Sequence, residues 1–298
     1  MFWQTTRYSI DLTRPRVMGI VNVTPDSFSD GGRLADLSAA LNHCERLLRD
    51  GAHILDIGGE STRPGAPSVP LEEELARVVP LVREAVRFDV PISVDTFKPA
   101  VMQAVLDLGA DIINDIRALG QPGAVEVVSR HPSCGICLMH MHRDPLTMQV
   151  LPMQGDVVPP VRAFLSQAAA RALSAGVARR RIVLDPGIGF GKTVAQNFSL
   201  LGRQAELLAE GFPLLVGWSR KSSLGAVTAT QGVAPGAASR LAASVAAAVL
   251  AVDRGATIVR VHDVLETVQA LAVWAAMREQ AALDSHVLIA KKDQETLG

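Results

Sequence analysis

The sequence predicts an α/β fold in which strands and helices alternate to form one (β/α)8 TIM barrel, a single domain with a short N-terminal extension. Short apolar runs alternate with amphipathic stretches along nearly all of the 298 residues. Glycines stand just past five of the helical stretches, where a left-handed helix cap needs them. Eight strand–helix units in about 250 residues also match the usual size of such a barrel.

The predicted elements follow one another in a regular order. The strand candidates are the apolar runs 17–22, 53–58, 91–95, 111–115, 135–140, 181–185, 213–217 and 257–261. The helical candidates between them are 36–50, 71–88, 99–108, 123–129, 158–175, 195–210 and 237–253, and 264–282 follows the last strand. The five punctuating glycines are Gly51, Gly109, Gly176, Gly211 and Gly255. An open, doubly wound sheet is the alternative, but the chain lacks a strong dinucleotide fingerprint.

No linker divides the chain into further domains. We expect residues 1–16 to be an extension that covers the bottom of the barrel and residues 17–283 to be the catalytic barrel. Residues 284–298 form a polar tail that is either partly disordered or an extension of the last helix.

The composition excludes some classes of binding partner and indicates the cellular compartment. The net charge of −1 argues against a nucleic-acid or anionic-membrane partner. No apolar run is as long as a membrane span, and the N-terminus lacks the order of a secretory signal. The three cysteines suggest buried, reduced thiols, although Cys134 and Cys137 have redox-motif spacing. A cytoplasmic protein is therefore predicted.

Polar residues stand at the carboxyl end of nearly every predicted strand. They are Asn22, Asp56, Asp95, Asn114 with Asp115, His140, Asp185, Ser219 with Arg220 and Lys221, and Arg260 with His262. In a barrel these positions meet at one mouth, where the chemistry takes place. We expect the ligand to be a polar heterocycle or a phosphorylated substrate.

Two clusters differ in charge. Asp95, Asn114 and Asp185 provide acceptors and an amide, which suit the N–H-rich edge of a 2-amino-pyrimidinone. Each of the three alone could equally be a loop or helix cap. The second cluster is basic and hydroxylic, and it comprises Asn22, Ser61, Thr62, Arg63, Arg260 and His262. Such donors fit a diphosphate with bound Mg²⁺, while a surface basic pair is the alternative for the last two.

The segment 185–193, Asp-Pro-Gly-Ile-Gly-Phe-Gly-Lys-Thr, has neither P-loop nor dinucleotide glycine spacing. We interpret it as a loop whose backbone approaches a flat ligand, with Phe190 as a wall. Lys192 is expected to be a solvated loop charge. His140 and His142 could be half of a metal site, but a structural or rim role is favoured because no matching set of ligands appears elsewhere.

Eight ordered motifs support a family assignment. They are Met-Gly-Ile-Val-Asn-Val-Thr-Pro-Asp-Ser-Phe-Ser-Asp-Gly-Gly (18–32), Asp-Ile-Gly-Gly-Glu-Ser-Thr-Arg-Pro-Gly (56–65), Ser-Val-Asp-Thr-Phe (93–97), Ile-Asn-Asp (113–115), Leu-Met-His (138–140), Asp-Pro-Gly-Ile-Gly-Phe (185–190), Ser-Arg-Lys (219–221) and Arg-Val-His (260–262). Over roughly residues 15–280 the chain resembles dihydropteroate synthase, the family of folate-pathway enzymes targeted by sulfonamides.

The resemblance implies a homodimeric, Mg²⁺-dependent transferase. It would condense 6-hydroxymethyl-7,8-dihydropterin diphosphate with 4-aminobenzoate to give 7,8-dihydropteroate and diphosphate. The implied pterin-binding residues are Asp95, Asn114, Asp185, Lys221, Met139 and Gly217. Asn22, Thr62, Arg260 and His262 match the diphosphate positions, with Asn22 also on the metal, and Arg63, Pro64, Phe190 and Ser219 match the aminobenzoate positions. Asp95, Lys221, Arg260 and His262 are the implied catalytic residues.

The chemistry of these groups favours an SN1-like substitution. Diphosphate would leave from a CH₂ on an electron-rich ring, and a carboxylate such as Asp95 would stabilise the cation. The chain departs from the family after 138–140, because His142-Arg143 stands where Gln-Gly is usual. Two alternatives are a catalytically silent pterin-binding paralogue and a methyltetrahydrofolate–corrinoid methyltransferase, which has no need of a diphosphate cluster.

Overall fold

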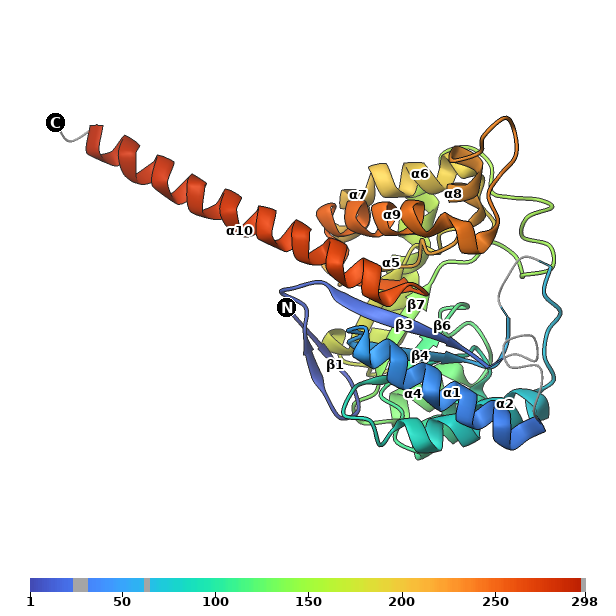
Figure 1. The fold of residues 1–298 in the computed structure, drawn as a ribbon. Coiled ribbons are helices and arrows are strands. Elements are labelled where there is room, and N and C mark those ends of the chain that lie inside the picture. The colour runs from blue at the N-terminus through green and yellow to red at the C-terminus, as the bar shows by residue number, and fades with distance from the viewer. Residues whose placement is uncertain (24–31, 62–64, 296–298) are drawn as a thin grey trace.

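The computed structural model describes residues 1–23, 32–61 and 65–295, and it shows eight parallel strands surrounded by helices (Figure 1). The strands are β3 (Arg16–Asn22), β4 (Ile54–Gly58), β5 (Ile92–Asp95), β6 (Ile112–Asp115), β7 (Gly135–Met139), β8 (Ile182–Asp185), β9 (Leu215–Val216) and β10 (Ile258–Val261). Their order is β8-β7-β6-β5-β4-β3-β10-β9, and a parallel bridge between Leu184 and Leu214 joins the two ends. The predicted barrel is confirmed.

The helices lie outside the barrel and mostly follow the predicted boundaries. They are α1 (Gly32–Arg49), α2 (Leu71–Ala85), α3 (Pro99–Asp107), α4 (Ala124–Arg130), α5 (Val158–Ser174), α6 (Val194–Gly202), α7 (Gln204–Leu208), α8 (Ser222–Val227), α9 (Leu241–Asp253) and α10 (Val264–Glu295). All five punctuating glycines have positive φ, between 71° and 97°, as the helix-cap interpretation requires.

Three helical predictions need correction. The predicted helix 195–210 is two helices, because the buried Gln204 turns to donate to the carbonyls of Ala251 (2.8 Å) and Arg254 (3.0 Å). The short helix α8 was not predicted. The first turn of the predicted helix 237–253 is a 3₁₀ turn, Ala237–Arg240. The last helix, α10, continues to Glu295, which was one of the two alternatives for the tail.

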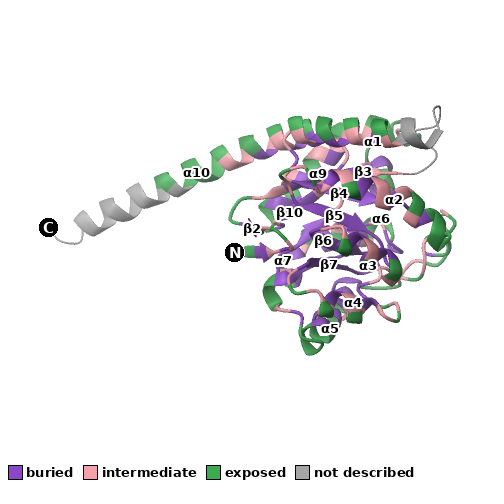
Figure 2. Cartoon of the chain, turned by 90° about the horizontal axis from the view of Figure 1, so that it is seen from below, coloured by how far each residue is buried: buried purple, intermediate pink, exposed green. Residues whose placement is uncertain are grey.

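The largest apolar core lies between the strands and the helices that surround them, and buried residues follow the strands (Figure 2). A second, smaller cluster fills the barrel near the amino-terminal ends of its strands and includes Met18, Ile112, Val183 and Ile258. All three cysteines are buried and free, as predicted. Among the described residues no helix is long and apolar enough to cross a membrane.

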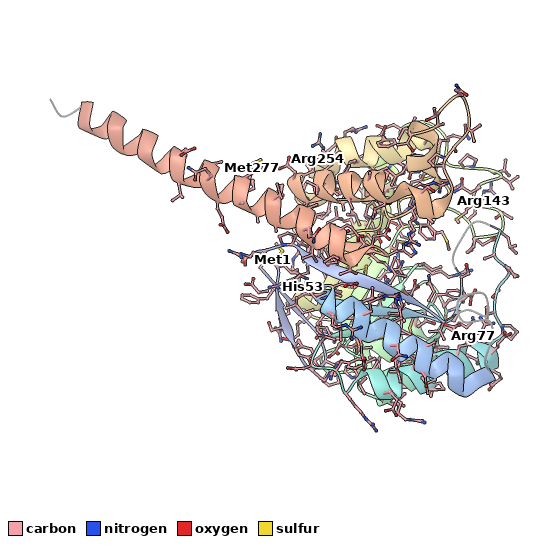
Figure 3. All side chains as sticks on the ribbon, in the orientation of Figure 1. Met1, His53, Arg77, Arg143, Arg254 and Met277 are labelled. Carbon is pink, nitrogen blue, oxygen red and sulfur yellow. The ribbon has the colours of Figure 1, made fainter. Side chains whose placement is uncertain are left out.

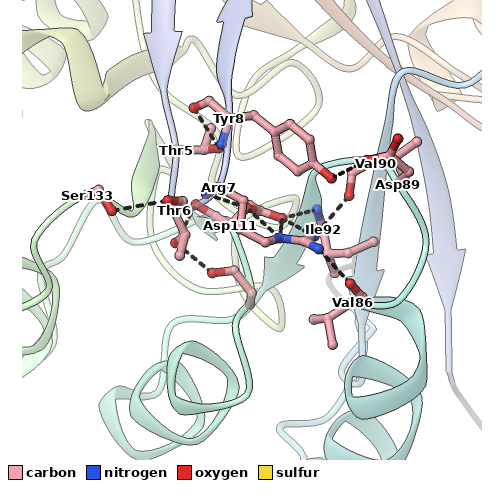
Figure 4. Close-up of polar contacts among 11 residues, drawn as sticks. Thr5, Thr6, Arg7, Tyr8, Val86, Asp89, Val90, Ile92, Asp111 and Ser133 are labelled. Atoms are coloured by element: carbon pink, nitrogen blue, oxygen red, sulfur yellow. Dashed lines mark hydrogen bonds and ion pairs between the residues drawn. The ribbon is translucent and has the colours of Figure 1, made fainter.

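An N-terminal hairpin, β1 (Phe2–Gln4) and β2 (Ser9–Asp11), covers this amino-terminal end of the barrel. Trp3 is fully buried in the second cluster, and its Nε1 donates to the carbonyl of Arg181 at 2.9 Å. Between the two strands, Arg7 forms an ion pair of 2.6 Å with the buried Asp111, which also accepts from the backbone N–H of Ile92 at 2.9 Å (Figure 4). Figure 3 labels Met1 and Arg143 at opposite ends of the barrel, so the hairpin lies far from the loops that follow the strands.

Candidate active site

A buried carboxylate organises the interior of the barrel mouth. Asp56, on β4, is fully buried. It accepts hydrogen bonds from the hydroxyl of Ser93 (2.6 Å), the amide of Asn114 (3.1 Å) and Nε of Arg260 (2.6 Å). Ser93 lies beside Asp56 in the parallel register, and alternate strand residues share one face, so these side chains all point into the barrel.

Arg260, on β10, connects this carboxylate with the next one. Its Nη2 donates to Oδ2 of Asp95 at 2.9 Å while its Nε bonds Asp56. Burial raises the pKa of Asp95 to about 7, and the positive charge of Arg260 opposes that rise. The two clusters that the sequence separated by charge are therefore joined at Arg260. This is a correction, and it arises because strands remote in sequence are neighbours inside the barrel.

Asp185 ends β8, opposite Met139 in the strand register. Its Oδ1 accepts the backbone N–H of Gly187 at 2.7 Å. Burial raises the pKa of Asp185 to about 6, while the Gly187 N–H bond and the charges of Lys221 and Lys192 oppose the rise. Asp185 is therefore held by the loop that follows its own strand.

The loops after β9 and β10 contribute a third group. The ammonium of Lys221 lies 4.3 Å from the centre of the Phe190 ring, a cation–π contact. Burial lowers the pKa of Lys221 to about 8. Ser219 Oγ lies 3.0 Å from Nδ1 of His262 and accepts the backbone N–H of His262 at 3.1 Å. Gly217 lies beside Arg260, because a side-chain carbon built there would be 3.9 Å from its Cβ.

Apolar side chains form one wall next to these polar groups. The cluster contains Phe97, Ile116, Met139, Met148 and Phe190, each at most 9% exposed. Three of these five residues, Phe97, Met139 and Phe190, belong to motifs noted in the sequence. Met148 was missed, because it comes from the β7–α5 loop (residues 140–157), whose contacts no local pattern predicted.

Some of the strand-end polar residues serve the fold instead. The carboxylate of Asp115 accepts the backbone N–H groups of Arg117 (2.7 Å) and Leu119 (2.8 Å). His140 is buried edge-on against Phe164, with ring centroids 4.9 Å apart, and burial lowers its pKa to about 3. A neutral, buried His140 agrees with the structural role that was favoured for it.

Three predicted residues, Thr62, Arg63 and Pro64, lie outside the described residues. Asn22 ends β3 and is partly exposed, in register with Gly58, which in turn faces Asp95. In the described part of the chain no three His, Cys, Asp or Glu side chains are grouped to hold a metal ion. Because Mg²⁺ accepts few protein ligands when phosphate oxygens and water complete its shell, one amide oxygen at this rim fits it.

Lys192 was expected to be solvated, and this was wrong. The side chain is only 2% exposed, and its ammonium donates to backbone carbonyls. No local pattern signals this burial, because Lys192 stands among loop glycines and directly before Thr193, the residue that caps α6, where a solvated charge is usual. The central role of Asp56 was also missed, although its position at a strand end was noted.

Comparison with known proteins places this site in a family. Residues 18–262 match the family model described as pterin binding enzyme. The chain is 52% identical over 280 residues to dihydropteroate synthase of Neisseria meningitidis serogroup B, covering 92% of this chain and 97% of the relative.

Two solved structures are similarly close. Dihydropteroate synthase of Burkholderia cenocepacia, complexed with 7,8-dihydropteroate, is 50% identical with a TM-score of 0.85, covering 95% of this chain and 98% of the other. The Xanthomonas albilineans enzyme with 4-aminobenzoic acid is 47% identical with a TM-score of 0.86, covering 93% and 99%. The chain therefore belongs to the dihydropteroate synthase family of pterin-binding enzymes.

Proposed function

We infer that this chain is a transferase that condenses 6-hydroxymethyl-7,8-dihydropterin diphosphate with 4-aminobenzoate to give 7,8-dihydropteroate and diphosphate. The observation that carries this inference is the meeting of acceptors and cations at one barrel mouth. Buried Asp95, Asn114 and Asp185 stand there with Lys221 and Arg260. The set offers acceptors to a pterin edge and positive charge to a leaving diphosphate.

The pterin ring would be recognised through its N–H groups. The amide nitrogen of Asn114 is committed to Asp56, so its oxygen is the part that can accept from a ligand. Asp185 uses Oδ1 for Gly187, and Oδ2 is offered to the ligand. Met139 and the other apolar residues of the wall would cover a ring face.

The reacting bond would break before the new bond is complete. Asp95, held by Arg260, places a carboxylate beside the cation that develops on the ring. Thr62, Arg260 and His262 would hold the departing diphosphate together with Asn22, which would also hold Mg²⁺, an ion that neutralises diphosphate charge when bound. The aromatic amine is already nucleophilic, so no strong general base is required.

Aminobenzoate would enter beside Phe190 and Ser219. The Phe190 ring packs against Lys221, and Ser219 Oγ lies within hydrogen-bond distance of His262. The proposed aminobenzoate residues are therefore in contact with His262, one of the proposed diphosphate residues. The Xanthomonas albilineans structure with 4-aminobenzoic acid supports the choice of second substrate. Arg63 and Pro64 are proposed for the same side through the family resemblance.

The competing functions can be separated from this one. The relatives reported above are named as synthases, which favours the synthase over the corrinoid methyltransferase. A silent paralogue would bind the pterin diphosphate without turnover. The test is to incubate purified protein with Mg²⁺ and each substrate alone or both together, and to measure dihydropteroate and diphosphate. Dihydropteroate formed only with both substrates supports the proposal, and binding without product would contradict it.

We also propose that the chain works as a homodimer. Exposed apolar side chains on α9 and α10, such as Leu250 (47%), Val273 (73%) and Met277 (54%), support an interface there. Light scattering after size-exclusion chromatography tests this, since a monomer at micromolar concentration would contradict it. The cytoplasmic location stays a prediction.

A further inference from the structure

Lys192 is one of the largest fully buried side chains of the barrel. Its ammonium donates to the carbonyls of Gly187 (2.8 Å), Phe190 (3.1 Å) and His140 (3.4 Å). The first two belong to the β8–α6 loop (residues 186–193), and the third belongs to the first residue of the β7–α5 loop, directly after β7. Three N–H donors thus meet three carbonyls from two neighbouring loops.

Such a burial is costly, because an ammonium loses its hydration and gains no carboxylate within bonding distance among the described residues. Burial accordingly lowers the pKa of Lys192 to about 7, and the charge of Asp185 opposes that fall. A surface lysine at this position would avoid the cost altogether. The arrangement therefore needs a compensating reason, which the neighbouring contacts provide.

The two loops approach each other too closely for side chains between them. A carbon added to Gly187 would lie 1.9 Å from the carbonyl oxygen of His140, and one added to Gly191 would lie 2.6 Å from that of His142. Both glycines have positive φ, 67° and 69°. Carbonyl groups consequently crowd this junction. The ammonium of Lys192 donates to three of them, of which the Gly187 carbonyl also accepts the backbone N–H of Phe190 at 3.1 Å.

Both loop residues that bond Lys192 also position groups of the site. The N–H of Gly187 holds Oδ1 of Asp185 at 2.7 Å. The residue Phe190 carries the ring that packs against the ammonium of Lys221 at 4.3 Å. The Lys192 side chain therefore ties the backbone behind a proposed pterin acceptor to the backbone behind a proposed aminobenzoate wall.

We propose that Lys192 is a positioning residue, whose ammonium clamps the β8–α6 loop to the end of β7 so that Asp185 and Phe190 are held for the two substrates. This rests on the proposed function, because it assigns Asp185 and Phe190 their substrates. Lys192 itself touches neither substrate, so removing it acts through the geometry of the other two residues.

The chain offers a matched control in Arg181, a second buried cation that donates to backbone carbonyls. Its Nε bonds the carbonyl of Cys134 (2.7 Å) and its Nη2 bonds that of Val128 (2.7 Å), at the amino-terminal end of β8. The Arg181→Met and Lys192→Met variants both leave buried carbonyls without a charged donor. They differ in which end of the barrel is affected.

The experiment measures KM for 4-aminobenzoate, kcat, and the calorimetric Kd for the pterin diphosphate in parent, Lys192→Met, Lys192→Arg and Arg181→Met. We expect Lys192→Met to raise the KM for 4-aminobenzoate and the Kd for the pterin diphosphate about tenfold each. This is the size of effect expected from losing one or two hydrogen bonds to a charged donor. Lys192→Arg should recover affinity to within about threefold, because it keeps charge and donors. Arg181→Met should change stability and leave both constants within about twofold.

The proposal would be overturned if Lys192→Met left the KM for 4-aminobenzoate and the Kd for the pterin diphosphate unchanged while losing stability as Arg181→Met does. Lys192→Gln takes its place if Lys192→Met does not fold. Its amide has no charge and only two N–H donors for three carbonyls, so an unchanged KM and an unchanged Kd there would overturn the proposal equally. Turnover by the parent is measured first, so a failure of the proposed function is seen in the parent. The calorimetric Kd tests the clamp independently of turnover.

Discussion

Arg260 is the residue on which the buried charges of the barrel mouth depend. It bonds Asp56, which is fully buried, and Asp95, which is 8% exposed. Removing the guanidinium would leave two carboxylates buried without their cation. Breaking a buried pair in this way costs about 3–5 kcal/mol, even where the intact pair adds little stability.

We therefore expect Arg260→Ala to have two effects. It should weaken the binding of pterin diphosphate and the inhibition by diphosphate, and it should lower the free energy of unfolding by about 3 kcal/mol. Arg260→Lys is the control, because it keeps a charge but cannot bridge two carboxylates as a guanidinium does. Calorimetry and urea unfolding measure both effects. Unchanged affinity for the substrate and for diphosphate would refute the diphosphate assignment.

Asp185 gives a prediction with a pH dependence. Its folded pKa is about 6, above the ordinary value of 3.8, so the penalty for burying its charge is absent below that value and grows as pH rises from 3.8 to 6. Asp185→Asn removes the penalty and keeps an acceptor for Gly187. The variant should be more stable than the parent at pH 8 by about 1–3 kcal/mol and nearly equal at pH ~3.5, below the ordinary pKa of the carboxyl, while binding pterin more weakly.

Urea unfolding of both proteins at the two pH values checks this prediction. A parent that is at least as stable as Asp185→Asn at pH 8 would show that the carboxylate is not buried at a cost. Asp185→Glu serves as the charge-keeping control, and its stability should fall with rising pH as the parent's does.

At the scale of elements, the sequence predicted the strands and most helices within a few residues. The reason is that apolar periodicity and helix-ending glycines are local signals. The N-terminal hairpin was not predicted, because each of its strands has only three residues. It is held by contacts of Trp3 and Arg7 with segments distant in the sequence. The break between α6 and α7 was not predicted for a similar reason, since Gln204 at the break donates a hydrogen bond to the carbonyl of Ala251 in α9.

The β7–α5 loop contains a non-glycine residue with a left-handed backbone. It is Arg143, at which the family resemblance led us to expect glycine, and its φ is 65°. A non-glycine residue in this conformation destabilises the folded state by about 1–2 kcal/mol. Replacing it with glycine would remove this strain, but it would also stabilise the unfolded state by increasing its conformational freedom, so the net gain is smaller. The loop also reaches its neighbours, through bonds from Gly65 N–H to the Pro145 carbonyl (2.9 Å) and from Met153 N–H to the Gly191 carbonyl (2.8 Å).

We expect Arg143→Gly to raise the free energy of unfolding by about 0.5–1 kcal/mol. Arg143→Ala is the matched control, because it removes the same side chain but keeps the Cβ and therefore the strain. Urea unfolding of the three proteins decides the matter. Equal stabilisation by alanine and glycine would mean that the guanidinium, rather than the backbone, is the source of the strain.

At the scale of the whole molecule, closure of the barrel brings together residues that no local pattern could connect. Asp56 and Arg260 are 204 positions apart in the chain and 2.6 Å apart in the structure. Strand ends could be predicted to meet because all parallel strands of a barrel end at one face. Which cation pairs with which carboxylate depends on strand order and side-chain reach. The prediction from the sequence therefore placed Asp95 and Arg260 in separate clusters and wrongly expected Lys192 to be solvated.

We propose that this mouth promotes departure of diphosphate from a bound dihydropterin, with Asp95 stabilising the cation. The most direct measurement compares Asp95→Asn with the parent, using calorimetry for pterin diphosphate binding and rapid-quench assays for diphosphate release and dihydropteroate formation. The variant should bind within about threefold of the parent and react about a hundredfold more slowly or worse. Equal losses in binding and in rate would contradict the claim, since Asp95 would then serve binding alone.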